Sequence, residues 1–309
     1  MLILINPYAC GGMALRKWER VQRRVIHALG IADVVTLGPS VDVARAVAQS
    51  IERGERQFVA AGGDGTVNLL LNAIMTHLPE KTHQSLQLGA IGLGSSNDFH
   101  KPARPTDDID GIPCKIRFAG AVPRDIGILE YRSSGKQESV YFLSNASLGV
   151  TADANYFFNH PTPVLALLKR VNTPSAILYA AIATILRPQS FSATVSDETG
   201  MSTTTRLTNM AILKNPHVSG SLRYDDPIRY NDGAFAVHLF HNMTRSELLR
   251  LLLALSRHRL DGIVNHRRWT TSCLHVSTHE PIAVEYDGEV VTADHASFRI
   301  IPQALQVCP

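Results

Sequence analysis

The sequence predicts an α/β domain with a parallel sheet, then a mainly β domain, with an active site in the cleft between them. In the first third of the chain, short apolar stretches alternate with helical stretches, as in βαβ units. From about Pro123 onward, β-rich stretches separated by turn residues dominate. The chain has 309 residues, 45% hydrophobic and 18% charged, which is enough for two domains with a sizeable core.

Each expected strand of the first domain is followed by an expected helix. The strands are expected at 2–6, 32–37, 57–61 and 86–94, and the helices near 13–29, 41–53, 66–77 and, as a short one, from Asn97. Parallel strands bring their carboxyl ends to one edge of a sheet, where ligands bind. We therefore look for functional residues directly after these strands.

The second domain is expected to be β-rich and to contain two helical segments. Its strand-like stretches lie at 140–148, 190–197, 203–213, 233–240, 273–278 and 282–294, and its helices near 163–187 and 244–258. These patterns predict an α/β domain at 1–124 and a β-rich domain at 125–297. We expect segment 298–309 to return to the first domain.

Composition excludes some classes of function. A formal net charge of +3 is too mild to indicate a nucleic-acid binder. Two basic clusters are either solvated surface or attracted to an anionic membrane: Arg16, Lys17, Arg20, Arg23 and Arg24, and then Arg257, His258, Arg259, Arg267 and Arg268.

The expected location is the cytoplasm, at the inner face of the membrane. The four cysteines form no C-x-x-C pair, which fits reduced thiols, and the chain begins on an apparent strand, so no signal peptide is expected. The apolar stretch "PSAILYAAIATILRP" is shorter than the roughly 20 residues that span a bilayer.

Three loops rich in glycine or other small residues follow strands of the first domain: "NPYACGG" (6–12), "GGDGT" (62–66) and "GLGSSND" (92–98). Such loops expose backbone N–H groups and commonly bind phosphates. Neither glycine loop has the P-loop lysine, and Asn97 stands where the dinucleotide fingerprint needs its third glycine. The loops therefore predict a phosphate site outside these two classes.

Asp64 places a carboxylate inside the second loop. Beside a polyphosphate it would be repelled, unless a divalent cation bridges the charges or the carboxylate accepts a proton. Phosphoryl transfer to an alcohol uses both devices. Asp64 could equally well cap the following helix, where Thr66 and Asn68 are also polar.

Together these motifs resemble the diacylglycerol kinase catalytic-domain family, which includes bacterial lipid kinases, sphingosine kinases and ceramide kinases. The resemblance continues through "NASLGVTAD" (145–153), "SGSLRYDDPIRYNDGAFAV" (219–237) and "VEYDGEV" (284–290). The loop "GGDGT" alone is shared with NAD kinases, which are more distant relatives. The run "GLGSSNDF" and the late "DGE" favour the lipid-kinase side.

The resemblance implies specific roles. Asp64 would organise Mg²⁺ and phosphates, Asp125 would support catalysis, and Glu289 would be the general base. A second, structural Mg²⁺ would be held by Asp232 and the backbone carbonyls of Arg229 and Ala234. The implied ATP site comprises Asn6, Pro7, Tyr8, Ala9, Cys10, Thr36, Gly62, Gly63, Asp64, Gly65, Thr66, Val67, Asn68 and Ser95.

Some positions have a second interpretation or depart from the family pattern. The stretches "EYDGEV" and "YNDGAF" are also good Asp-Gly hairpins. Cys10 stands where a glycine is common, Ser95 replaces a commoner threonine, and His100 stands where a small residue is frequent.

The predicted function is an ATP- and Mg²⁺-dependent lipid kinase of phospholipid metabolism, phosphorylating a hydroxyl of a membrane lipid such as diacylglycerol, ceramide or a sphingoid base. One alternative is an NAD kinase or another small-molecule kinase. Another is a non-catalytic relative that binds nucleotide or lipid. The expected partner is the membrane lipid, with peripheral contact to the membrane surface, and a homodimer is left open.

Overall fold

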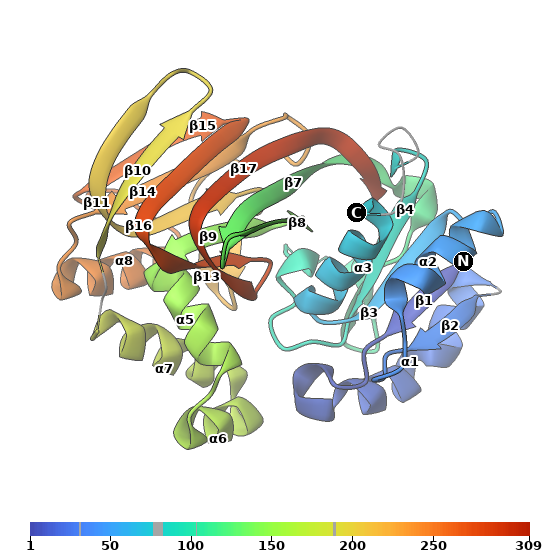
Figure 1. Ribbon diagram of the computed structural model, residues 1–309. Coiled ribbons are helices and arrows are strands. Elements are labelled where there is room, and N and C mark those ends of the chain that lie inside the picture. The colour runs from blue at the N-terminus through green and yellow to red at the C-terminus, as the bar shows by residue number, and fades with distance from the viewer. Residues whose placement is uncertain (31, 77–82, 103, 188–189) are drawn as a thin grey trace. The chain divides into compact units, whose positions relative to one another are not determined.

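The computed structural model describes residues 1–30, 32–76, 83–102, 104–187 and 190–309. It forms two compact units, Met1–Ile126 together with Pro302–Pro309, and Gly127–Ile301. The chain leaves the first unit within β7 (Val122–Ser133) and returns within β17 (Glu289–Val307). The predicted fold class is confirmed, because the first unit is α/β and the second is mainly β (Figure 1).

The first unit is built on a parallel sheet in the order β2-β1-β3-β4. These strands are β1 (Leu2–Ile5), β2 (Asp33–Thr36), β3 (Gln57–Gly62) and β4 (Gln87–Gly92). The end of β17 pairs with the start of β4 in parallel, with Val307 opposite Leu88. The other end of β4 pairs antiparallel with β6 (Ile112–Lys115), which forms a small hairpin with β5 (Asp108–Ile109).

Three helices pack on this sheet: α1 (Ala14–Leu29), α2 (Val43–Glu52) and α3 (Asp64–Thr76). Strands β1 and β3 are buried almost throughout, as expected for a sheet covered on both faces. Helix α1 buries Trp18 and Val21 in the same cluster as Ile3 and Val59. The helix expected near 66–77 begins at Asp64, and its expected last residue lies outside the described residues.

Short 3₁₀ turns shape the connections of the first unit. They are η1 (Ala9–Gly12), η2 (Asp98–His100), η3 (Pro105–Asp107) and η4 (Phe118–Gly120). Two of them, η1 and η2, follow β1 and β4 and belong to the loops that the sequence singles out.

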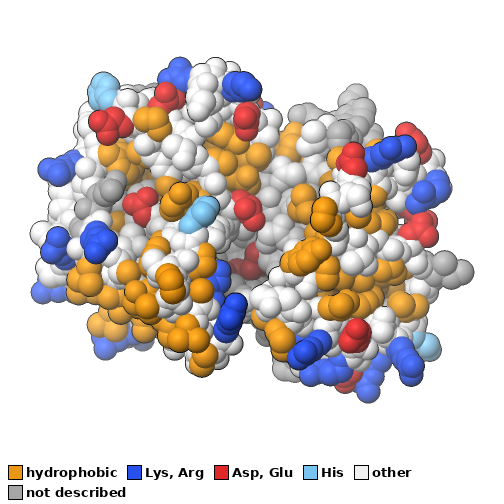
Figure 2. Space-filling view, turned by 60° about the horizontal axis from the view of Figure 1, so that its bottom comes forward, with side chains coloured by type: hydrophobic (Ala, Val, Ile, Leu, Met, Phe, Trp, Pro, Cys, Tyr) orange, Lys and Arg blue, Asp and Glu red, His pale blue; other side chains and the backbone are white. Residues whose placement is uncertain are grey.

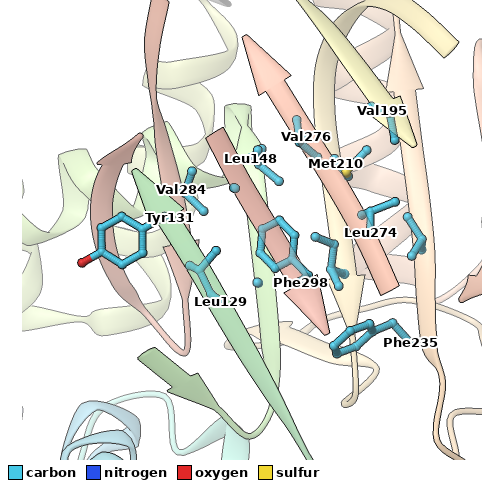
Figure 3. Close-up of a cluster of buried hydrophobic side chains, with 14 of the residues drawn as sticks. Leu129, Tyr131, Leu148, Val195, Met210, Phe235, Leu274, Val276, Val284 and Phe298 are labelled. Carbon is cyan, nitrogen blue, oxygen red and sulfur yellow. The ribbon is translucent and has the colours of Figure 1, made fainter. Parts of the chain in front are cut away.

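The second unit is an antiparallel β structure around one large core. Figure 3 shows side chains of this core, including Leu129, Met210, Phe235 and Phe298, between the strands. The strands are β8 (Lys136–Phe142), β9 (Asn145–Gly149), β10 (Phe191–Asp197), β11 (Ser202–Leu213), β12 (His217–Ser219), β13 (Leu222–Arg223), β14 (Phe235–His241), β15 (His266–Thr271) and β16 (Cys273–Tyr286), with parts of β7 and β17.

The helices of the second unit are α5 (Val150–Asn159), α6 (Pro163–Val171), α7 (Thr173–Ile185) and α8 (Arg245–Arg257). The helical stretch expected near 163–187 is divided into α6 and α7. Asn172 has an extended backbone (φ −154°), caps α7 through its side chain, and is followed by Pro174 near the helix start, so the helix is broken there. Among the described residues, no helix combines the length and apolarity needed to cross a membrane.

Candidate functional site

The three loops predicted to bind phosphate follow neighbouring parallel strands. Ile5 at the end of β1 lies opposite Ala61 of β3, and Gly62 at the end of β3 lies opposite Gly92 of β4. The loops that begin at Asn6, Gly62 and Gly92 therefore leave the same edge of the sheet. Thr36, at the end of β2, lies opposite Ile5 at this edge as well.

The second and third loops are packed backbone to backbone. The N–H groups of Leu93 and Gly94 donate to the carbonyl of Gly62 at 2.8 and 3.1 Å. A Cβ atom on Gly94 would lie 2.4 Å from the Cα of Gly63, and one on Gly62 would lie 2.2 Å from the Thr66 hydroxyl. Gly94 is therefore required for the close contact between the two loops, and Gly62 for the packing of Thr66 within its own loop.

Asp64 is the first residue of α3 and is half-buried. Its Oδ1 accepts a hydrogen bond of 2.9 Å from the backbone N–H of Phe99 in η2. A carboxylate in the first turn of a helix interacts favourably with the helix dipole. Asp64 therefore joins the second loop to the third, which goes beyond capping its own helix.

The first loop is tied to the second by Asn6. Its amide donates to Thr66 Oγ1 at 3.0 Å, and its Oδ1 accepts from the N–H of Tyr8 at 3.0 Å. Lys17 of α1 was not predicted as a site residue, yet its ammonium donates to the carbonyls of Leu93 and Gly94, both at 3.2 Å. In the sequence, Lys17 is one of several basic residues, and nothing local distinguishes it.

The other predicted nucleotide residues are placed as follows. Tyr8 and Ser95 are exposed, whereas Pro7, Ala9, Cys10, Gly63 and Gly65 are half-buried. Thr66, Val67 and Asn68 are buried in the first turns of α3. Asn68 accepts hydrogen bonds from the Asn72 amide through both its carbonyl and its Oδ1.

Asp125 lies in β7 and is completely buried. Its Oδ1 accepts a hydrogen bond of 2.9 Å from the backbone N–H of Gln303, in the segment that returns to the first unit. Two cations flank the ring of Phe99: the Lys115 ammonium and the Arg124 guanidinium lie 5.2 and 5.7 Å from its centroid. Burial, followed by the charge of Arg124, lowers the pKa of Lys115 to about 8.

In the second unit, the "DGE" stretch forms a tight turn between β16 and β17. Tyr286 pairs with Glu289, and Asp287 and Gly288 both have positive φ, so the hairpin interpretation is confirmed. Glu289, the predicted base, is exposed at the start of β17. Burial and the charges of Glu289 and Asp287 raise the pKa of Tyr286 to about 12.

Two carboxylates beside Glu289 hold this turn in place. Asp287 accepts hydrogen bonds from the backbone N–H groups of Leu143, Ser144 and Asn145 at 2.7, 2.8 and 3.2 Å. Glu285 is buried, accepting from the Ser147 hydroxyl at 2.6 Å and from the Gly288 N–H at 2.7 Å. Neither was predicted as a site residue, although the "DGE" motif already marked the Asp287 position.

The three residues predicted to hold a structural Mg²⁺ are brought together, but around a lysine. The ammonium of Lys214 donates to the carbonyl of Arg229 at 2.8 Å, to Asp232 Oδ1 at 2.9 Å and to the carbonyl of Ala234 at 2.9 Å. A lysine ammonium has no lone pair and cannot be a metal ligand. A divalent cation at these three residues therefore does not fit the structure.

The Mg²⁺ implied near Asp64 is a different case. Within the described ranges, no group of three or more His, Cys, Asp or Glu side chains could hold a metal ion. Mg²⁺ is typically bound by only one or two carboxylates, with water and substrate phosphates completing its shell. A carboxylate between glycine loops fits a cation that arrives with a nucleotide.

The first 127 residues match the family model for the diacylglycerol kinase catalytic domain. The resemblance predicted from the motifs is thereby confirmed over this part of the chain, which includes all three loops, Asp64 and Asp125.

Individual relatives match less than half of the chain. "Probable lipid kinase YegS-like" of Cronobacter sakazakii is 40% identical over 125 residues, covering 40% of each chain. "Acylglycerol kinase, mitochondrial" of Mus musculus is 24% identical over 157 residues, covering 49% of this chain and 36% of that protein. The matches thus span well under half the length of these relatives.

The fold likeness extends over nearly the whole chain. The crystal structure of a diacylglycerol kinase from Bacillus anthracis aligns with a TM-score of 0.68 at 12% identity, covering 99% of this chain and 95% of that one. At this identity the likeness shows the fold alone. The predicted position of the active site between the two domains stays a prediction.

Proposed function

We propose that this protein is an ATP- and Mg²⁺-dependent lipid kinase that transfers the γ-phosphate to a hydroxyl of a membrane lipid. The observation that carries the proposal is the interlocked pair of glycine loops with Asp64 between them, in a stretch that matches the diacylglycerol kinase catalytic domain. This arrangement supports binding of a phosphate chain together with its cation.

The roles of the chain's residues follow from their chemistry. Bound Mg²⁺ would offset the charge of the phosphates. Asp64 orients the phosphate chain at the start of α3, whose N–H groups also favour anions. Glu289 accepts the proton of the lipid hydroxyl while the hydroxyl oxygen attacks the γ-phosphorus. The bond from the γ-phosphorus to the oxygen that bridges the β- and γ-phosphates breaks, and ADP leaves.

Exposed apolar side chains of α6 and α7 support contact with a membrane surface. Three of them stand at helical spacing along each helix: Val164, Leu167 and Val171 on α6, and Leu178 and Ile182 on α7 with Leu186 at its C-cap. In Figure 2 hydrophobic side chains gather at the lower left, where these helices lie. Exposed Arg170 and Arg187 add charges that favour anionic lipid.

An NAD kinase or another small-molecule kinase is the second candidate, because the "GGDGT" loop is compatible with both. A non-catalytic relative is the third. The presence of Asp64, Asp125 and Glu289 supports an active kinase over that third candidate.

Transfer of label from ATP to a lipid extract or to NAD, with product identification by mass spectrometry, tests the proposal. We expect a phosphorylated lipid with Mg²⁺ and none after chelation. Labelled NAD without labelled lipid would favour the second candidate, and no product from either would favour the third.

The assignment of the base is tested separately. Glu289→Gln is expected to lower kcat by about 10²- to 10⁴-fold, the usual contribution of a general base. Glu280→Gln, at an exposed glutamate in the same unit, is the matched control and should leave kcat unchanged. Equal activity of the two variants would remove Glu289 from the mechanism.

A further inference from the structure

The environment of Lys214 is unusual for a lysine. Lys214 directly follows β11, and its side chain is completely buried. Lysine is rarely found fully buried unless its charge is paired. Here the acceptors are two backbone carbonyls and the Asp232 carboxylate, all from the turn between β13 and β14.

The geometry is that of an ammonium and not of a displaced metal site. The three distances from Nζ, 2.8 to 2.9 Å, are ordinary charge-assisted hydrogen bonds. Mg²⁺ would need oxygens at about 2.0–2.1 Å and Ca²⁺ at about 2.3–2.6 Å. The acceptors thus surround a group with three donors, which is what a lysine ammonium supplies.

The charge of Lys214 also opposes a metal ion. Burial alone would raise the pKa of Asp232, but the hydrogen bond and charge of Lys214 lower it. The ammonium and the Asp232 carboxylate form an ion pair with an N···O distance of 2.9 Å. A divalent cation added beside the ammonium would be repelled by its positive charge.

We propose that Lys214 replaces the structural divalent cation in this chain. Its ammonium fastens the 229–234 turn to the end of β11 without metal. The chain's stability is therefore insensitive to chelators, and removing the lysine uncovers a latent cation site made of the same three oxygens.

The lysine also connects this turn to the "DGE" turn. The backbone N–H of Lys214 donates to the carbonyl of Ser144 at 2.8 Å, and the N–H of Ser144 donates to Asp287 at 2.8 Å. A chain of hydrogen bonds thus runs from the lysine to the residue two positions before Glu289. The backbone of Lys214 thus contacts the segment that holds the "DGE" turn, while its ammonium holds the 229–234 turn.

Thermal unfolding of the full chain without nucleotide tests the proposal independently of any kinase activity. The wild-type midpoint is expected to be the same in chelator and in about 10 mM MgCl₂ or CaCl₂, with NaCl matching the ionic strength. Lys214→Ala should unfold several degrees lower in chelator and recover by about 5 °C in either cation. Lys214→Ala combined with Asp232→Ala should lose this recovery.

Several outcomes would overturn the proposal. One is a wild-type unfolding midpoint that falls in chelator and recovers with Mg²⁺. If Asp64→Asn shows the same fall and recovery, the stabilising cation is not the one at Asp64. Another is a Lys214→Ala protein that gains no more from cations than the double variant. If Lys214→Ala does not fold, Lys214→Met is measured instead, because methionine keeps much of the buried aliphatic chain. The comparison of the wild-type midpoint with and without chelator tests the proposal without any variant.

Discussion

Cys10 shows at the scale of one residue why a glycine is common at its position. Its backbone is left-handed (φ 53°, ψ 40°) and is followed by two glycines that also have positive φ. This conformation costs a side-chain-bearing residue about 1–2 kcal/mol relative to the right-handed region. Cys10 is therefore a strained residue in the first loop, at a position whose backbone conformation favours glycine.

Substitutions at Cys10 should rank by backbone preference. Cys10→Gly is expected to raise the free energy of unfolding by about 0.5 kcal/mol, because relief of strain exceeds the added flexibility of glycine. Cys10→Val should lower it by about 1 kcal/mol, since β-branched residues disfavour positive φ most. Urea unfolding at equilibrium measures both, and a glycine variant less stable than the valine variant would contradict the assignment.

Asp287 is the second residue whose role can be tested alone. Asp287→Ala removes the acceptor of three backbone N–H groups and should lower the free energy of unfolding by about 3 kcal/mol. Asp294→Ala, in β17 just after this turn, breaks a surface ion pair with Arg132 and should change stability little. Similar losses in these two variants would show that the turn does not depend on Asp287.

At the scale of elements, the first unit depends on two loops that touch through their glycines. These loops match neither the P-loop nor the dinucleotide fingerprint. Their contact explains why glycine is nevertheless needed at particular positions in them. The sequence marks the loops as ligand-binding, but the closest neighbour of Gly94 is the backbone of Gly63.

Gly94→Ala is expected to separate these loops and to weaken ATP binding at least tenfold, with a loss of stability of roughly 1–3 kcal/mol from overpacking. Gly38→Ala is the control, because a Cβ there meets nothing within 4 Å. Nucleotide titration by calorimetry and urea unfolding provide the two measurements. Unchanged ATP affinity in Gly94→Ala would show that the nucleotide does not use these loops.

The α6–α7 surface gives the other prediction at this scale. Val171→Asp, at a side chain that is 76% exposed, should reduce co-sedimentation with anionic lipid vesicles several-fold. Leu253→Asp, at a 47% exposed leucine of α8, should not. Equal loss of binding in both variants, or in neither, would remove α6 and α7 as the membrane contact.

At the scale of the whole molecule, the buried His100 and the half-buried His266 make stability depend on pH. Burial is the main cause that lowers the pKa of His100 and of His266 to about 4 each, from 6.5. Below pH 6.5 the unfolded chain binds protons that the folded chain does not, so stability falls as the pH drops from about 6.5 toward 4. Above about pH 6.5 both histidines are neutral in the folded and the unfolded chain, and they no longer lower the free energy of unfolding.

For His100, which is 3% exposed, the loss amounts to roughly 3 kcal/mol at full protonation of the unfolded state. His100→Gln should therefore flatten the decline in urea-unfolding free energy between pH 6.5 and about 4.5. His27→Gln is the control, at an exposed histidine of α1. If the free energy of unfolding falls equally steeply with pH in His100→Gln, groups other than His100 cause the decline.

The sequence predicted the fold class because the periodicity of strands and helices depends on residues that are close together in the chain. It predicted the loops for the same reason. It did not locate the boundary between α6 and α7 at Asn172, because the apolar pattern continues across the cap and the proline. It also missed Lys17 and Lys214. Both lysines act on carbonyls that are distant in the sequence and are brought near only by the fold, so no local signal distinguishes them from solvated lysines.

The returning segment 302–309 has a consequence for synthesis. Cys308 donates its N–H to Leu88, and Gln306 donates to Leu86, so an outer strand of the first sheet comes from residues translated some 200 positions later. When the first unit leaves the ribosome, β6 can already pair with Ala90 and Ile91 of β4, but Gln87 and Leu88 have no strand beside them on that side. That part of the sheet is completed only after the entire second unit has been translated.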